Sequence, residues 1–82
     1  MQIMNNLLEY KYDILASLYI IPCSLEELCS RDFCRNLPIW AVDKFLYRLE
    51  MDGYIKKTQS GIYRTIKKKA RRKLNELGYE IE

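Results

Sequence analysis

The side chains with the clearest chemistry are lysines and arginines, and they gather in the second half of the chain. Residues 54–82 hold nine Lys and Arg against three Asp and Glu, a balance of +6, whereas residues 1–53 hold five against eight, a balance of −3. Together these balances make the net charge of +3. A concentrated set of cations is the pattern that neutralises phosphate groups. The simpler alternative is a solvated lysine-rich helix, since runs of charge are common on exposed helix faces.

Cysteine is the other reactive residue type, with three copies, Cys23, Cys29 and Cys34, in a chain that has no histidine. A structural zinc site usually needs four Cys or His ligands, and here a fourth ligand is missing and the cysteines are spaced too widely. A cysteine nucleophile would lack an evident base. Cys29 and Cys34 could form a disulfide in an oxidising or hyperthermophilic cytosol. The favoured alternative is that at least two of the three are small buried apolar side chains.

No residue set in this sequence resembles an active site. There is no nucleophile–base pair, no set of metal ligands and no glycine-rich phosphate loop, and the chain is short for a sizeable pocket. We therefore expect a protein that is not an enzyme. The sequence predicts no catalytic residues, no metal, no cofactor and no evident small-molecule ligand.

Length and composition predict a single domain spanning residues 1–82. Apolar residues make up 49% of the chain and charged residues 30%, which argues against disorder. No stretch approaches the ~18 to 20 consecutive apolar residues of a membrane span. The start of the chain carries Glu9 and Asp13 and lacks the pattern of a secretory signal. We expect a cytoplasmic protein that makes no membrane contact, and the abundance of Ile, Lys, Arg and Glu favours a heat-adapted source.

Two helices are predicted in the first third of the chain. The first covers about residues 5–20 and ends before Pro22, because the residue before a proline is kept out of the helical region. Its broad apolar face belongs to the core or in part to a subunit contact, and consists of Leu7, Leu8, Tyr12, Ile14, Leu15, Leu18 and Tyr19. The second helix, about 25–31, begins at a capping box formed by Ser24 and Glu27 and buries Leu25 and Leu28.

A third helix is predicted at about residues 37–52, with Pro38 in its first turn and Asn36 or Leu37 as its cap. Apolar residues at helical spacing define an inward face of Val42, Phe45, Leu46 and Leu49. The outer face is then Ile39, Trp40, Asp43, Lys44, Tyr47 and Arg48. Trp40 either packs under the preceding turn or contacts a partner, because an exposed tryptophan is unusual in a small domain.

After Gly53 the pattern changes to that of short strands. Tyr54-Ile55 and Ile62-Tyr63 flank Gln59-Ser60-Gly61, which predicts a hairpin with strands at about 54–58 and 62–66 and a positive φ at Gly61. A last helix is predicted at about 67–78, with Gly78 as its cap. Its apolar stripe is Ile66, Ala70, Leu74 and Leu77.

The run from Ser24 to Gly78 resembles the winged helix-turn-helix superfamily of transcriptional regulators, including the multiple-antibiotic-resistance and phenolic-acid-response types. Small regulators from archaea and their viruses share this layout. The strongest local likeness is Leu49-Glu50-Met51-Asp52-Gly53-Tyr54-Ile55, which is similar to the family's junction between recognition helix and wing. The resemblance implies a mainly α fold with a small β-hairpin, in the order helix-helix-helix-strand-strand-helix.

The resemblance also implies that the chain binds double-stranded DNA and regulates transcription, in the host cytoplasm if the source is a virus. The helix at 37–52 would lie in the major groove and the wing at 54–66 on the backbone or in the minor groove. Lys44 and Arg48 share one helix face and could reach phosphates or guanine edges. The residues implied to contact DNA are Trp40, Lys44, Tyr47, Arg48, Lys56, Lys57, Gln59, Ser60, Arg64, Lys67 and Lys68.

Related regulators often dimerise through terminal helices, so the resemblance implies a homodimer. The wide face of the first helix and the tail of Leu74, Leu77, Tyr79 and Ile81 are compatible with one. The first turn of the third helix departs from the family, because Leu37, Pro38, Ile39 and Trp40 offer few hydrogen bonds. A second interpretation is therefore a winged-helix protein–protein adaptor with little specific DNA binding, in which Ile39 and Trp40 form an exposed apolar anchor.

Overall fold

The computed structural model describes the backbone of residues 3–81 and the side chains of residues 10–81. Over this range the chain is mainly helical, with a small antiparallel sheet of three strands in the order β1-β3-β2. The elements along the chain are α1 (Ile3–Ile20), β1 (Cys23–Ser24), α2 (Leu25–Cys29), the 3₁₀ turn η1 (Asp32–Cys34), α3 (Ile39–Met51), β2 (Ile55–Lys57), β3 (Ile62–Thr65) and α4 (Lys67–Glu76).

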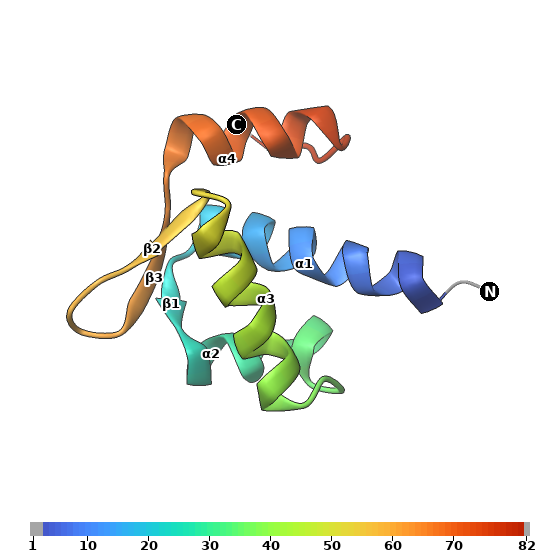
Figure 1. Cartoon of the computed structure of the whole chain (residues 1–82), viewed down its shortest axis with the longest axis vertical. Coiled ribbons are helices and arrows are strands. Elements are labelled where there is room, and N and C mark those ends of the chain that lie inside the picture. Colours follow the sequence, from blue (N-terminus) through green and yellow to red (C-terminus); the bar gives the residue numbers. More distant parts are fainter. Residues whose placement is uncertain (1–2, 82) are drawn as a thin grey trace.

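Helix α1 lies in the middle of the molecule (Figure 1). It packs against α4 on one side and α3 on the other, and it also contacts β3. The β2–β3 hairpin leaves this helical body and projects to the left in Figure 1. The hairpin therefore contacts α3 through β2, whereas α4 packs on α1.

The core is built from one apolar face of each major helix and the inner face of the sheet. The largest fully buried side chains come from all of these elements and include Ile14, Leu15, Leu18, Leu28, Val42, Leu46, Leu49, Ile55 and Leu74. The predicted inward face of α3 is confirmed, with Phe45 half-buried against the core. Of the broad face predicted for α1, the part at Tyr12 to Tyr19 packs into this core. The side chains of Leu7 and Leu8 lie outside the described residues.

The capping box at the start of α2 is confirmed. The Glu27 amide donates to Ser24 Oγ at 3.2 Å, and the Ser24 amide donates to Glu27 Oε1 at 3.0 Å. The helix is shorter than predicted and ends at Cys29. The residues just before it form β1, which the predicted element order lacks: Cys23 pairs with Tyr63 and Ser24 with Ile62. A strand of only two residues shows no alternation of apolar and polar residues in the sequence, and it is recognised only from its pairing with β3.

Helix α3 begins at Ile39, slightly later than the predicted start near Leu37-Pro38, and the choice of Asn36 or Leu37 as its cap was wrong. The N-cap is Pro38, whose backbone is extended at ψ 151° and whose carbonyl accepts hydrogen bonds from the Ala41 and Val42 amides. The proline ring restricts the preceding residue to extended conformations, so Leu37 cannot enter the helix. The strands and α4 are also shorter than predicted, and at α4 the cause is the cap at Leu77 and Gly78.

The glycine stops are confirmed at both helix ends. Gly53 has a φ of 84° and Gly78 a φ of 90°, conformations that L side chains rarely adopt. After α3, the Gly53 amide donates to Glu50 O and the Tyr54 amide to Leu49 O, each at 3.0 Å. This pair of hydrogen bonds is a Schellman motif, and it turns the chain directly from α3 into the hairpin.

The hairpin tip is a tight turn, and its predicted glycine is also confirmed. Gly61 has a φ of 86°, and its amide donates to Thr58 O at 3.0 Å. The Thr58 amide donates to Ile62 O at 2.8 Å, and Thr58 Oγ1 accepts from the Ile62 amide at 3.1 Å. A three-residue loop closed by a left-handed glycine matches the twist of the flanking strands.

In the part of the chain that the structure describes, no helix is both long enough and apolar enough to cross a membrane.

Candidate nucleic-acid interface

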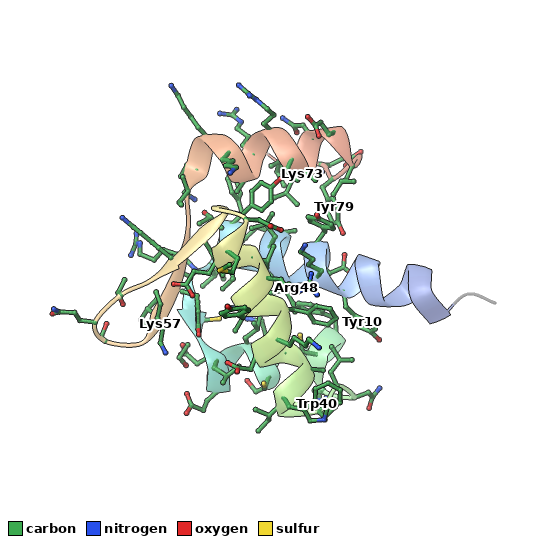
Figure 2. The ribbon with its side chains drawn as sticks, viewed as in Figure 1. Tyr10, Trp40, Arg48, Lys57, Lys73 and Tyr79 are labelled. Atoms are coloured by element: carbon green, nitrogen blue, oxygen red, sulfur yellow. The ribbon has the colours of Figure 1, made fainter. Side chains whose placement is uncertain are left out.

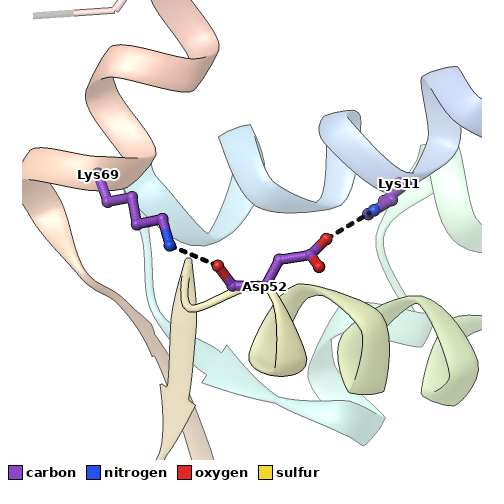
Figure 3. Close-up of polar contacts among 3 residues, drawn as sticks. All are labelled: Lys11, Asp52 and Lys69. Carbon is purple, nitrogen blue, oxygen red and sulfur yellow. Dashed lines mark hydrogen bonds and ion pairs between the residues drawn. The ribbon is translucent and has the colours of Figure 1, made fainter.

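The junction between α3 and the hairpin is held by the residue at the end of α3, Asp52. The Lys11 ammonium of α1 forms an ion pair with Asp52 Oδ2 at 3.1 Å, and the Lys69 ammonium of α4 donates to Asp52 O at 2.6 Å (Figure 3). Lys69 Nζ also lies 5.2 Å from the centre of the Tyr54 ring. Helices α1 and α4 thus both contact the point where α3 passes into the hairpin.

We expect Gly53→Ala to destabilise the fold more than Gly78→Ala does. Both glycines follow a helix in the left-handed region, which costs an L residue about 1–2 kcal/mol. A Cβ at Gly53 would lie 2.8 Å from Lys69 Nζ, so the flexible end of Lys69 must shift and weaken its hydrogen bond to Asp52 O, whereas a Cβ at Gly78 meets nothing within 4 Å. Weakening that exposed hydrogen bond should add at most about 1 kcal/mol, measured as the difference in free energy of unfolding in urea. In a Lys69→Met background the two substitutions should cost the same, and a persisting difference would contradict this explanation.

The outer face of α3 is exposed as predicted. Trp40 is 69% exposed and so does not pack under the preceding turn, and Tyr47 is 60% exposed. Lys44 and Arg48 are exposed on the same helix. Figure 2 shows Trp40 at the end of α3 away from the hairpin junction and Arg48 closer to it. Two further apolar side chains, Ile39 and Met51, are exposed on this helix at 64% and 68%. Met51 was not part of the predicted outer face, because it was considered only within the Leu49–Ile55 junction.

On the hairpin, strand pairing brings two predicted cations together and separates a third. Lys56 of β2 is the direct partner of Arg64 of β3, so both side chains stand on the same exposed face. Lys57 pairs with Tyr63, which is 6% exposed, and its ammonium lies 5.6 Å from that ring. Lys57 therefore belongs to the opposite face of the hairpin. Like charges placed directly opposite each other repel, and an anionic partner would relieve this repulsion.

The remaining predicted residues fall at the tip and at the start of α4. Gln59 and Ser60 are exposed in the turn, where the Ser60 and Thr58 hydroxyls lie 3.1 Å apart. Lys67 is held by α1, because its ammonium donates to Tyr19 O at 3.0 Å and lies 4.2 Å from the Tyr19 ring. Lys68 is exposed beside it. Since α4 packs on α1, its cations form a surface separate from the outer face of α3.

Several cations serve the fold itself, which the charge balance along the chain does not reveal. The Arg31 guanidinium donates to Ser17 O at 3.3 Å, to Ile21 O at 3.2 Å and to the Ser17 hydroxyl. It thereby satisfies carbonyls at the end of α1, where a cation is favourable. Lys11, Lys67 and Lys69 likewise bind oxygens of neighbouring elements.

The three cysteines are free thiols. Cys23 and Cys34 are buried, as favoured from the sequence, and Cys29 is half-buried. Burial raises the pKa of the Cys34 thiol to about 11 and also raises the pKa of Cys23 and Cys29. The thiols are therefore protonated at neutral pH, the form that is a poor nucleophile. Among the described residues no group of three or more Cys, Asp or Glu side chains is placed to hold a metal ion.

No protein-family model, curated protein or solved structure matches this chain.

Proposed function

We propose that this chain is a winged helix-turn-helix protein that binds double-stranded DNA and regulates transcription. In this proposal α3 is the recognition helix and the β2–β3 hairpin is the wing. The observation that carries it is the pair of Lys56 and Arg64, two facing cations on a hairpin that follows α3 directly and contacts it through β2. A hairpin and a helix presented side by side fit the backbone and the major groove of one duplex.

The outer face of α3 would provide the contacts within the groove. Lys44 and Arg48 stand four residues apart on that face, and their cations can reach phosphates or guanine edges. The Tyr47 hydroxyl can donate to a phosphate oxygen. The exposed Trp40 and Ile39 offer apolar contact to thymine methyl groups. We assign most of the affinity to contacts between the hairpin and the phosphate backbone, because each phosphate that a cation neutralises releases counterions.

The proposal includes a homodimer in the cytoplasm. Two copies of α3 about one DNA turn apart, ~34 Å, would read the two halves of a palindrome. The apolar residues of α1 from Tyr12 to Leu18 pack in or against the core, so they are not offered to a second subunit. Leu77, just after α4, supports a dimer better than α1 does. It is 46% exposed and belongs to the C-terminal tail that was predicted to contribute to dimerisation.

One observation favours a second function, a protein–protein adaptor. Ile39, Trp40 and Met51 are each more than 60% exposed on one helix. Exposed tryptophan is enriched among residues that dominate protein interfaces. In this case α3 would contact a protein partner and the hairpin would bind DNA weakly or not at all.

Selection of bound duplexes from a random pool at physiological salt tests the proposal. We expect enrichment of a two-part palindrome whose half-sites are centred about 10 base pairs apart, together with a dimer mass by light scattering. A pool without enrichment, and binding that disappears as salt is raised to moderate concentration, would favour the adaptor. The Cys29→Ser variant is a suitable form of the protein for these measurements, because it removes the most accessible thiol.

A further inference from the structure

A second basic surface lies on the side of α4 that faces away from the core. A groove of about 610 Å³ runs between the end of α1 and this side of α4, lined by Tyr19, Lys67, Lys68, Arg71, Arg72 and Asn75. We call it the α1–α4 groove. Its cations all belong to α4, and Arg71 and Arg72 are not among the residues predicted to contact DNA, so the proposed DNA interface does not account for the whole surface.

The cations of this groove lie where the helix and one another destabilise them, in the N-terminal part of α4. Helix α4 opens with three consecutive lysines, has no acidic residue in its first turn and has no side-chain cap. Cations at a helix N-terminus oppose the helix dipole, and like charges four residues apart, such as Lys68 and Arg72, repel. Within the described residues Lys68, Arg71 and Arg72 form no ion pair, and the one acid in the groove, Glu76, is paired with Lys73 at 4.0 Å. A carboxylate-bearing ligand would relieve these repulsions.

Apolar surface adjoins the cations. A smaller hollow, lined by Tyr19, Ile20, Glu80 and Ile81, shares Tyr19 with the α1–α4 groove. Ile20 is 70% exposed and the next residue, Ile21, is 59% exposed. A phosphate backbone would leave these isoleucines in water, whereas a polypeptide with apolar side chains would cover them.

We propose that the α1–α4 groove binds an acidic amphipathic segment of a partner protein. Carboxylates of that segment pair with Lys68, Arg71 and Arg72, and the arginines can each hold a carboxylate through two parallel hydrogen bonds. Apolar side chains of the same segment pack on Tyr19 and Ile20. A groove of this volume takes a few side chains, not a folded domain. The inference does not depend on DNA binding, because the two surfaces share no residue except Lys67 and Lys68, the first-turn lysines.

The test uses a fluorescent peptide of about 15 residues, long enough to form a helix, with Glu on one face and Leu on the other. Fluorescence anisotropy measures its affinity for the full chain. Arg71→Gln/Arg72→Gln is expected to weaken binding about ten-fold or more, and Ile20→Ser by roughly three-fold or more. The matched control is Lys56→Gln/Arg64→Gln, which removes the same charge from the hairpin and should change peptide affinity by less than about two-fold.

Three results would overturn the inference. The first is equal loss in the arginine variant and the hairpin control, which would mean attraction by net charge alone. The second is equally tight binding of a peptide with Gln in place of Glu. The third is displacement of the peptide by a short DNA duplex or by phosphatidylserine vesicles whose own binding needs Arg71 and Arg72, which would assign the groove to nucleic acid or membrane. Duplex binding by the arginine variant, measured in parallel, reports on the proposed DNA interface separately.

Discussion

Replacing Lys56 and Arg64 together by glutamine is expected to lower the affinity for duplex DNA by roughly 30-fold at physiological salt. Each phosphate contact contributes about 0.9 to the slope of log K against log salt, so the slope should fall by about 2. The reason is the register of the hairpin, which places these two cations opposite each other on one exposed face. Both can then follow the same stretch of phosphate backbone.

The same double variant should fold as well as the unaltered chain or slightly better. Two like charges directly opposite each other on a sheet destabilise it by roughly 0.2–1 kcal/mol, and the substitutions remove both charges. Weaker DNA binding combined with an unchanged or higher melting temperature cannot arise from unfolding. The measurements are fluorescence anisotropy over a salt series and thermal denaturation followed by circular dichroism.

Lys57→Gln is the control for this prediction, since it removes a neighbouring charge from the other face. Lys57 pairs with Tyr63 and its ammonium lies near that ring, so we expect an affinity within about three-fold of the unaltered chain. A double variant that keeps both its affinity and its salt slope would show that the hairpin does not contact DNA. Equal losses in the double variant and the control would show that only total charge matters.

Leu46→Ala is expected to destabilise the fold by about 2–5 kcal/mol, whereas Tyr47→Ala should change stability by less than about 0.5 kcal/mol. These adjacent residues of α3 have different surroundings: Leu46 has no exposed surface and Tyr47 is 60% exposed. Truncating Leu46 leaves a cavity between α3 and the rest of the core. For a domain of this size the loss corresponds to a fall in melting temperature of roughly 10–30 °C.

The effects on DNA binding should be reversed. At a temperature where Leu46→Ala is still folded, its affinity should match that of the unaltered chain, because its outer face is intact. Tyr47→Ala should bind DNA more weakly by roughly 10- to 100-fold, because it loses one hydrogen bond to a charged group, worth about 1.5–3 kcal/mol. A Tyr47→Ala variant with full DNA affinity and reduced affinity for a protein partner would instead support the adaptor function.

Local features could be predicted from the sequence because few neighbouring residues encode them. The capping box needs only Ser24 and Glu27, and the helix stops need only Gly53 and Gly78. The buried side of α3 follows from the spacing of its apolar residues. The hairpin tip likewise depends on Thr58, Gly61 and the residues between them. Each of these features is decided by backbone geometry or periodicity within one or two turns of the chain.

Features that depend on contacts between distant residues were decided by the tertiary structure. Strand β1 exists because Cys23 and Ser24 meet β3 some forty positions later. Lys67, which was predicted to contact DNA, donates a hydrogen bond to a backbone oxygen of α1. Lys69, a neighbouring cation of the same basic run, donates to the backbone oxygen of Asp52. The register of the hairpin joins Lys56 to Arg64 and leaves Lys57 on the other face.

The sequence by itself therefore determined the approximate extent of the four helices and of the hairpin, the glycine stops after α3 and α4, and that positive charge gathers after Gly53. It could not divide that charge into cations that stabilise the fold, cations on the hairpin and cations in the α1–α4 groove. Charge is a property of each residue, but its direction in space depends on strand pairing and on the packing of α4 against α1. Those long-range contacts produced two separate basic surfaces from one basic stretch of sequence.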